Sequence, residues 1–252
     1  MKEFTVDKLT VRIFGTREEM GNAASRAAAD CVKENLKKKE TLNILFAAAP
    51  SQNEFLEGLV ADHSIPWERI NAFHMDEYIG LEETHPAGFH NFLDRHIFKQ
   101  VRFKSINYLN GNAPNIEEEI QRYTNLLNAA PLDLCFMGVG ENGHVAFNDP
   151  PVADFDDRAT VKSVELEERC RIQQVHDGCF HTLSEVPKRA LTVTVPGIMR
   201  ANEIYCMVPA STKADAVCAM LKGPIGTQCP ASILRMHAKA TLYLDMDSSA
   251  KL

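Results

Sequence analysis

The residues best suited to chemistry lie in a glycine-rich segment, residues 138–151, which reads GVGENGHVAFNDPP. His144 follows the last of three glycines, and the apolar run LCFM leads into the segment as a buried strand would. A histidine near neutral pH can both take and give a proton, provided that neighbouring amide or carboxylate groups orient it. Asn142 and Asp149 are near enough in sequence to do so. The glycines and the strand-end position favour this acid–base site over a histidine that only satisfies backbone groups.

The same segment matches the pattern G-x-G-x-x-G, which is typical of dinucleotide binding when a helix begins at once. Here two prolines follow within a few residues and exclude a long helix. We therefore expect no nicotinamide cofactor. Gly140 and its neighbours instead let the backbone turn sharply and come close to a ligand.

A second polar cluster, HMDEY, contains His74, Asp76 and Glu77 at the end of another apolar run. Strand alternation predicts that His74 and Asp76 point to one side and Glu77 to the other. Such a cluster suits a solvated loop, a metal site or a catalytic base. A metal site could combine His74, Asp76, His144 and Asp149, but no common metal-binding spacing is present, so we expect no metal.

Two further segments suit an anion. Residues 47–54 read AAAPSQNE, in which Ser51 and Glu54 form a capping-box pattern, and the hydroxyl of Ser51 lies beside free backbone N–H groups. An ordinary helix cap explains this segment equally well. Lys213 falls in the first turn of a predicted helix, where the helix dipole disfavours a cation. It either extends into solvent or binds an anion such as phosphate.

Strand-like and helix-like patterns alternate along the chain and must position these clusters. A capping box at Thr16 opens the first predicted helix, and IEEEIQRYTNLLNAA is clearly amphipathic. The alternating segment 8–14 is typical of an edge strand. Further predicted strands are 42–48, 70–75, 132–140, 190–195, 203–208 and 240–246, and further predicted helices are 53–63, 116–130 and 211–223, the last ending at Gly223.

This alternation predicts an α/β fold, a single domain over residues 1–252. We expect an open, mainly parallel, Rossmann-like sheet with helices on both faces. Ligands of such folds bind beyond the carboxyl ends of the strands. The segments AAAPSQNE, HMDEYIGL and the His144 loop all fall at predicted strand ends, so we expect one site there.

Composition excludes several classes of function. The formal net charge is −7, which gives no overall attraction to nucleic acid. No run of eighteen apolar residues and no signal-peptide pattern occurs, so we expect no membrane span. The seven cysteines are scattered and form no C-x-x-C pair, which indicates a reducing, cytoplasmic location.

Four segments together resemble a known family. FHMDEYIGL, LNGNAP, GVGENGHVAFNDP and VPKRALTVTV, in this order, are similar to those of the glucosamine-6-phosphate deaminases, over about residues 40–245. The related 6-phosphogluconolactonases share the histidine loop but typically continue differently after it, whereas VAFNDP matches the deaminases. The resemblance implies conversion of an amino sugar phosphate and water to a ketose phosphate and ammonia, without metal or organic cofactor. It implies a small sugar phosphate as the partner and is compatible with a homo-oligomer.

The resemblance also implies roles for the reacting side chains. Asp76 would move a proton between C2 and C1 of the sugar during enolisation. His144 would carry the proton needed to open the pyranose ring. Asn142 and Asp149 would orient and polarise its imidazole.

The phosphate would be held by Ser51 and Lys213 together with the backbone around Ala48 and Ala49, and Gly140 would border the substrate. Counted without gaps from His144, the family's two phosphate-binding arginines fall on Thr160 and Gln174. A loop shift could bring Arg158, Arg169 or Arg171 into their place, and we expect Arg171 to serve.

Two other departures bear on the imidazole. Many members of the family have Asp where this chain has Asn142, and Glu where it has Asp149. An amide orients a histidine but does not stabilise its cation. Two other functions therefore stay open at this point. One is a lactonase that needs His144 but no enolising base, and the other is a non-catalytic sugar-phosphate sensor.

Overall fold

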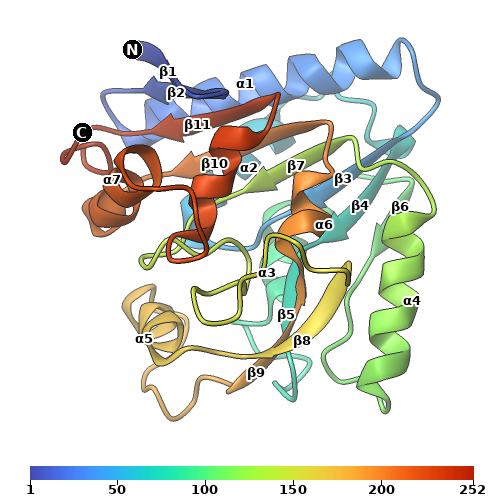
Figure 1. The fold of residues 1–252 in the computed structure, drawn as a ribbon. Coiled ribbons are helices and arrows are strands. Elements are labelled where there is room, and N and C mark those ends of the chain that lie inside the picture. The colour runs from blue at the N-terminus through green and yellow to red at the C-terminus, as the bar shows by residue number, and fades with distance from the viewer.

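The computed structural model describes residues 1–252, and its centre is an eight-stranded sheet with the order β1-β2-β11-β10-β7-β3-β4-β6 (Figure 1). The mainly parallel α/β fold predicted from the sequence is confirmed. The strands are β1 (Lys2–Val6), β2 (Leu9–Ile13), β3 (Leu42–Phe46), β4 (Ile70–His74), β6 (Ser105–Asn107), β7 (Leu134–Met137), β10 (Glu203–Val208) and β11 (Ala240–Leu244).

All neighbouring strands in this sheet are parallel except β1 and β2, which form an antiparallel pair at one edge. The prediction that residues 8–14 form an edge strand was wrong, because β2 lies between β1 and β11. The alternating pattern is explained by partial exposure of Thr10 and Arg12. Strand order reverses between β3 and β7: the chain proceeds from β3 to β4 and β6, then returns to the other side of β3 as β7. This reversal is the switch point at which such sheets bind ligands.

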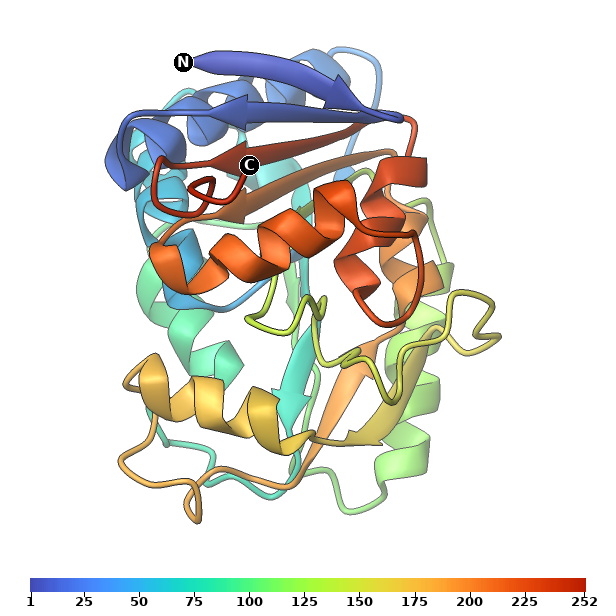
Figure 2. The same cartoon turned by 60° about the vertical axis from the view of Figure 1, so that its left-hand side comes forward.

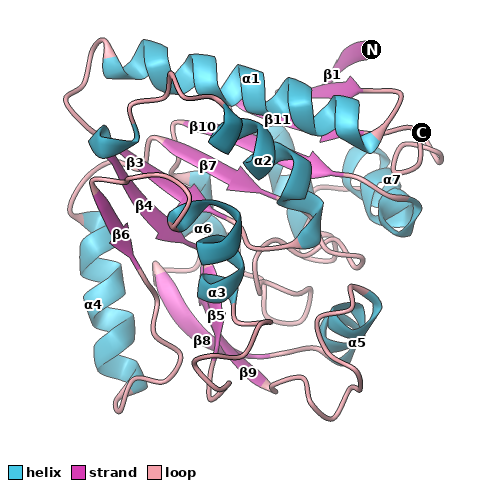
Figure 3. Cartoon of the chain, turned by 180° about the vertical axis from the view of Figure 1, so that it is seen from behind, coloured by secondary structure: helices cyan, strands magenta, loops and turns pink.

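Helices cover both faces of the sheet, as predicted. Figure 3 shows α1, α2 and α3 in front of it, and Figure 2 shows α7 on the opposite face. The helices are α1 (Arg17–Leu36), α2 (Asn53–Ala61), α3 (Phe89–Leu93), α4 (Ile116–Asn128), α5 (Glu168–His176), α6 (Val195–Met199) and α7 (Ala214–Lys222).

Two apolar cores, one on each face, hold these layers together. In β3, Ile44 and Phe46 join the core under α1 and α2, whereas Leu45 joins the core under α4 and α7. In β7, Phe136 joins the core under α1 and α2, and Cys135 joins the core under α4 and α7. Successive side chains of a strand point to opposite faces, so a strand buried on both sides is a continuous apolar run.

A second, three-stranded sheet lies below the first and has the order β5-β9-β8. It consists of β5 (Asp76–Tyr78), β8 (Val161–Glu165) and β9 (Arg189–Val193), and its pairs are antiparallel. The apolar run 190–195 was predicted as a strand of the main sheet, which was wrong, because its strand is the centre of this small sheet. Met75 joins the sheets: its N–H donates to Phe46 of β3, and its carbonyl accepts from Val193 of β9.

The predicted helix starts are confirmed only in part. Thr16 caps α1 by accepting a hydrogen bond from the N–H of Glu19, and the Glu19 carboxylate accepts from the N–H of Gly15. The capping box predicted at Ser51 was wrong: Pro50 begins a short 3-10 turn, and α2 starts after it without a side-chain cap. A similar 3-10 turn over Ser211–Lys213 precedes α7, which ends at Gly223 as predicted.

The hydroxyl of Tyr123 fixes the end of β4, from which the polar cluster HMDEY continues. This hydroxyl accepts a hydrogen bond of 2.9 Å from the N–H of His74 and donates one of 2.8 Å to its carbonyl oxygen. Tyr123 belongs to α4 and is fully buried. One side chain therefore satisfies both backbone groups of a residue at the point where the chain leaves the main sheet.

Replacing Tyr123 by Phe should destabilise the protein by about 1–3 kcal/mol, because it leaves buried backbone groups of His74 without partners. Urea unfolding followed by circular dichroism measures this. Tyr78→Phe is the matched control, since the buried hydroxyl of Tyr78 has no hydrogen-bond partner. Equal stability of the two variants would contradict the assigned role of Tyr123.

Candidate active site

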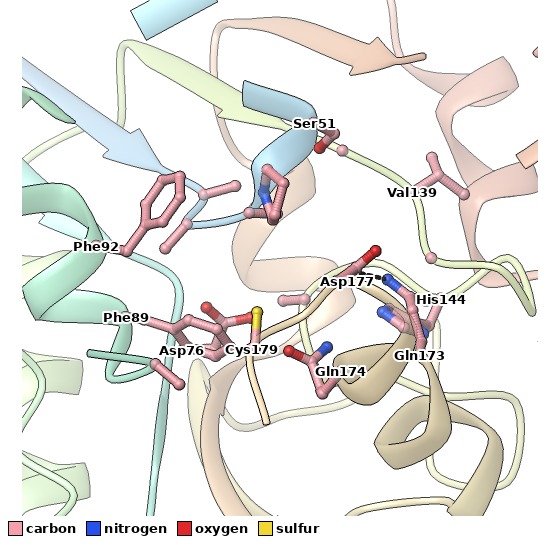
Figure 4. A pocket seen from close by; sticks show the side chains of 18 of the residues that line it. Ser51, Asp76, Phe89, Phe92, Val139, His144, Gln173, Gln174, Asp177 and Cys179 are labelled. Atoms are coloured by element: carbon pink, nitrogen blue, oxygen red, sulfur yellow. Dashed lines mark hydrogen bonds between the residues drawn. The ribbon is translucent and has the colours of Figure 1, made fainter. Parts of the chain in front are cut away.

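A cavity of about 340 Å³ lies at the carboxyl edge of the main sheet. Four segments that follow β3, β4, β7 and β10 border it, and the end of α5 closes one side (Figure 4). The order of these strands is β10-β7-β3-β4, so four segments far apart in sequence become neighbours. The cavity straddles the switch point between β3 and β7.

Each of these segments contributes at least one polar side chain to the cavity. Along the sheet order they are Lys213 after β10, His144 after β7, Ser51 after β3 and Asp76 after β4. The sequence analysis singled out all four, and the structure brings them together. Figure 4 shows Ser51, Asp76 and His144 around the same space.

The carboxylate of Asp76 is buried at the cavity wall, with 8% of the residue exposed, and it accepts no hydrogen bond from the protein. Burial raises its pKa well above the ordinary aspartate value, and the negative charge of Glu77 raises this pKa further. An ionised Asp76 is consequently a stronger base than an aspartate in water.

Glu77 points away from the cavity and holds the neighbouring segment in place. It accepts hydrogen bonds from the N–H groups of Tyr78, Phe89 and His90 and from Nδ1 of His90 at 2.7 Å. Burial alone would raise the pKa of Glu77, but His90 lowers it below its ordinary value, so Glu77 carries a charge. Phe89, which Glu77 anchors, lines the cavity beside Asp76.

His74 does not share the side of Asp76, which corrects the prediction from strand alternation. The chain leaves β4 at Met75, so the alternation is broken between these two residues. Nε2 of His74 accepts from the N–H of Leu109, and its Nδ1 lies 3.0 Å from the carbonyl oxygen of Asp76. His74 is a buried structural residue outside the cavity. The four-residue metal set considered from the sequence is therefore not assembled.

The imidazole of His144 is oriented through its Nδ1 atom. This atom lies 2.7 Å from Oδ1 of Asn142 and 3.0 Å from Oδ1 of Asp149. Both neighbours are acceptors there, so Nδ1 carries the proton, and Nε2 of the neutral ring is left free to accept one. The amide of Asn142 also donates to Asp149 at 2.9 Å. Asn142 and Asp149 thus both contact Nδ1 of His144.

Asp149 supplies the negative charge that an amide alone lacks. Burial by itself would raise the pKa of Asp149, but its interactions with His144 and Asn142 lower it below the ordinary value. An ionised Asp149 can stabilise a protonated His144. The Sγ atom of Cys170 lies in the same cluster, and the donor atoms of His144, Asp149 and Cys170 are within 4.8 Å of one another.

Gly140 is required because the imidazole occupies the space of a side chain. A Cβ atom on Gly140 would lie 2.1–2.4 Å from three ring atoms of His144. Gly143 is needed for a different reason, since its φ of +84° is unfavourable for other residues. No helix follows the loop, as expected from the two prolines.

The cavity also contains groups that are suited to an anion. Lys213 is 7% exposed and makes no hydrogen bond or ion pair through its Nζ atom, and burial lowers its pKa. Ser51 and the backbone at Ala48 and Ala49 line the same cavity. The absence of a side chain at Gly138 makes room for the Ser51 hydroxyl, 3.0 Å from where a Cβ atom would be.

Arg171 does not line the cavity, which corrects the sequence prediction. Its guanidinium donates to the carbonyl oxygens of Leu183 and Val186, and these hydrogen bonds tie α5 to the following loop. Arg158 and Arg169 do not line the cavity either. The cavity instead contains Gln174, which is buried and whose side-chain amide is unpartnered.

Sequence reasoning missed several residues that line the cavity. One signal could have revealed Arg17: it is the first residue of α1, where the helix dipole disfavours a cation, as it does at Lys213. No sequence signal marks the others, which reach the cavity only through tertiary packing. They are Arg95, Gln173, Asp177 and Cys179.

This chain is similar in sequence and in fold to known proteins. Residues 15–243 match the family model described as glucosamine-6-phosphate isomerases/6-phosphogluconolactonase. The chain belongs to this family. Two similar relatives are glucosamine-6-phosphate deaminases. That of Lactobacillus delbrueckii subsp. bulgaricus is 32% identical over 93% of this chain and 95% of its own length, and that of Bacillus cereus (strain B4264) is 30% identical over 95% and 88%.

Two solved structures are also similar to this chain. A glucosamine-6-phosphate deaminase described as monomeric has a TM-score of 0.87 and 28% identity, covering 96% of this chain and 99% of its own. The 6-phosphogluconolactonase of Thermotoga maritima has a TM-score of 0.76 over 94% of this chain and 100% of its own, but at 17% identity this shows a shared fold only. None of the helices in this family member is long and apolar enough to cross a membrane.

Gly140→Ala should displace the His144 imidazole, because the added Cβ atom and the ring cannot occupy the same space. We expect turnover to fall by about 10²–10⁴, the typical contribution of a positioned acid–base group. A crystal structure of the variant and its activity test this. Gly226→Ala is the control, since a Cβ atom there meets no other atom within 4 Å. An unmoved ring with full activity in Gly140→Ala would contradict the argument.

Proposed function

We propose that this protein is an amino sugar phosphate deaminase, converting glucosamine 6-phosphate, or a close analogue such as galactosamine 6-phosphate, and water to a ketose 6-phosphate and ammonia. The observation that carries this proposal is the arrangement of Asp76, His144, Ser51 and Lys213 around one cavity. These four residues supply a carboxylate base, an imidazole, a hydroxyl and a lysine suited to an anion. The deaminase relatives support the choice of substrate.

Ring opening is the first step that the geometry supports. The Nε2 atom of neutral His144 is free to accept the proton of the sugar's O1 hydroxyl, because Nδ1 is held by Asn142 and Asp149. The imidazolium that forms then gives a proton to the ring oxygen as the C1–O5 bond breaks. Asp149 stabilises this transient cation by its charge.

Enolisation follows on the open-chain sugar, and Asp76 is placed to carry it out. Its carboxylate takes the proton from C2 and returns it to C1, while O1 gains a proton and the amino nitrogen loses one, so the C1 aldehyde becomes an alcohol and C2 becomes an imine carbon. The resulting C2 imine reacts with water to release ammonia and leave a ketose. A base with a raised pKa is suited to a C–H proton, because its ionised form binds that proton more tightly.

Lys213 and Ser51 bind the 6-phosphate in this proposal. A buried ammonium without a partner is unfavourable, and a phosphate would supply the missing negative charge. The N–H groups at the starts of α2 and α7 add to this attraction. The unfavourable free energy of burying the Lys213 ammonium in the free protein is offset only when an anionic substrate binds.

One chain contains every residue used above, so the proposed reaction requires no second copy. All seven cysteines are free thiols, which supports a cytoplasmic location for the proposed enzyme. We also propose that residues 1–252 form one folding unit. Support comes from the shared core, in which Tyr78 of the small sheet packs with residues of the main sheet.

Asp76→Asn should abolish ammonia release from glucosamine 6-phosphate while leaving its binding nearly unchanged. The amide has the same shape but cannot accept the C2 proton, so kcat should fall by about 10²–10⁴. Coupled detection of ammonia gives kcat and KM. Full activity in Asp76→Asn would remove this residue from its role.

The same variant distinguishes the deaminase from a lactonase. A lactonase needs no enolising base, so hydrolysis of 6-phosphogluconolactone by a lactonase would be indifferent to Asp76→Asn. Lactone hydrolysis in both the original protein and the variant, without ammonia release in either, would sink the deaminase proposal in favour of a lactonase. Binding of sugar phosphates without any turnover would indicate a sensor.

Asp76→Asn should also make the protein more stable at neutral pH. The folded state raises the pKa of Asp76, so it binds the proton more tightly than the unfolded chain does. Ionising Asp76 therefore costs stability once the pH exceeds the pKa of the unfolded carboxyl. The gain in Tm should shrink as the pH is lowered below the ordinary aspartate pKa, near 4. A gain in Tm that does not depend on pH would contradict this explanation.

A further inference from the structure

Lys213 is a buried cation without a direct ion pair in the protein; the negative charges of Asp177 and Glu141 act on it only from beyond ion-pair distance. Its side chain is more than nine-tenths buried at the cavity wall, and no acidic group lies within ion-pair distance of Nζ. A phosphate dianion needs more than one such donor. The arginine expected from the sequence, Arg171, is engaged elsewhere. The question is which cation completes the site.

Arg17 is a second cation lining the same cavity, and it is held rigidly. Its Nε donates to Oε1 of Glu54 at 2.5 Å, and its Nη2 donates to the carbonyl oxygen of Pro50. Pro50 precedes Ser51, so these contacts place the guanidinium beside the serine loop. Nη1 donates no hydrogen bond within the protein. Arg17 therefore presents free N–H donors to the cavity that Ser51 also lines.

The position of Arg17 in its helix argues for an anionic ligand. It is the first residue of α1, a helix of 20 residues, and the positive end of the helix dipole disfavours a cation there. Glu54 offsets part of this cost, and its own position in the first turn of α2 is favourable. Both Arg17 and Lys213 thus stand at helix starts that attract anions. Together with Ser51 they come from three separate helix starts around one space.

We infer that Arg17 supplies the second cation of the phosphate site and, with Lys213 and Ser51, determines specificity for phosphorylated sugars. The inference rests on the proposed function for the identity of the sugar, but not for phosphate binding itself. A guanidinium offers two parallel N–H donors to phosphate oxygens, which a lysine does not. The arginine of this site comes from α1, whereas the sequence analysis sought it near α5.

The test measures binding of inorganic phosphate by calorimetry and steady-state kinetics with glucosamine 6-phosphate. Arg17→Gln should weaken phosphate binding by about 10- to 100-fold, the range expected for a charge-assisted hydrogen-bond pair. KM should rise by a similar factor while kcat stays within about twofold, because the phosphate is held equally in the ground and transition states. The phosphate affinity and KM of Arg17→Lys should lie between those of the original protein and those of Arg17→Gln.

Arg12→Gln is the matched control. Arg12 is 34% exposed against 35% for Arg17, and its Nε also pairs with a glutamate, Glu3, but it lies on β2 outside the cavity. We expect no change in phosphate affinity for this variant. Phosphate binding by Arg17→Gln that equals that of Arg12→Gln would overturn the inference.

The deaminase proposal and the proposed role of Arg17 can be rejected independently of each other. Loss of phosphate binding in Arg17→Gln, with no ammonia release by the original protein, would reject the deaminase and keep the phosphate site. Normal ammonia release with unaltered KM in Arg17→Gln would reject the role of Arg17 alone. If Arg17→Gln does not fold, Arg17→Lys decides the matter, since it keeps the charge and loses the paired donors. Phosphate affinity and KM equal to those of the original protein in Arg17→Lys would then overturn the inference.

Discussion

Parallel pairing of four adjacent strands is the constraint on which the rest of this structure depends. Parallel strands end at the same edge, so the segments after β10, β7, β3 and β4 meet although they are widely separated in the chain. The reversal of strand order between β3 and β7 leaves a space at this edge that no crossover helix fills. Apolar residues on both faces of these strands make their placement rigid. Side chains at the edge therefore receive fixed positions without having to stabilise the fold themselves.

The cavity contains charged groups whose burial without a direct partner is energetically unfavourable. Asp76 is buried without a hydrogen-bond partner and next to a charged Glu77, and Lys213 is buried without a counter-ion. Glu77, in contrast, accepts four hydrogen bonds, and Nδ1 of His144 contacts Asn142 and Asp149. Asp76 and Lys213, which lack partners, both face the cavity, whereas Glu77 behind them is paired. This division is expected where a folded protein stores free energy for binding and proton transfer.

The sequence was informative wherever a pattern depends on neighbours in the chain. The apolar runs, the Thr16 cap and the glycines around His144 were predicted correctly, because each reflects local backbone geometry. It failed where tertiary contacts decide. The run 190–195 forms a strand of the second sheet. The sequence could not predict this, because buried antiparallel and buried parallel strands have the same apolar composition. Arg95 and Gln173 reach the cavity only through packing between distant elements, which spacing does not encode.

The passage of the chain from β4 to β5 at Met75 separates two tasks. Segments that follow strands of the large sheet carry Lys213 and Ser51, the proposed anion-binding residues, whereas Asp76 belongs to the first strand of the small sheet. Sequence change in the small sheet can consequently alter or remove Asp76, the proposed base, without changing the proposed anion-binding residues. A scaffold divided in this way can acquire a different reaction on the same class of ligand, which offers a physical reason why deaminases and lactonases share one architecture.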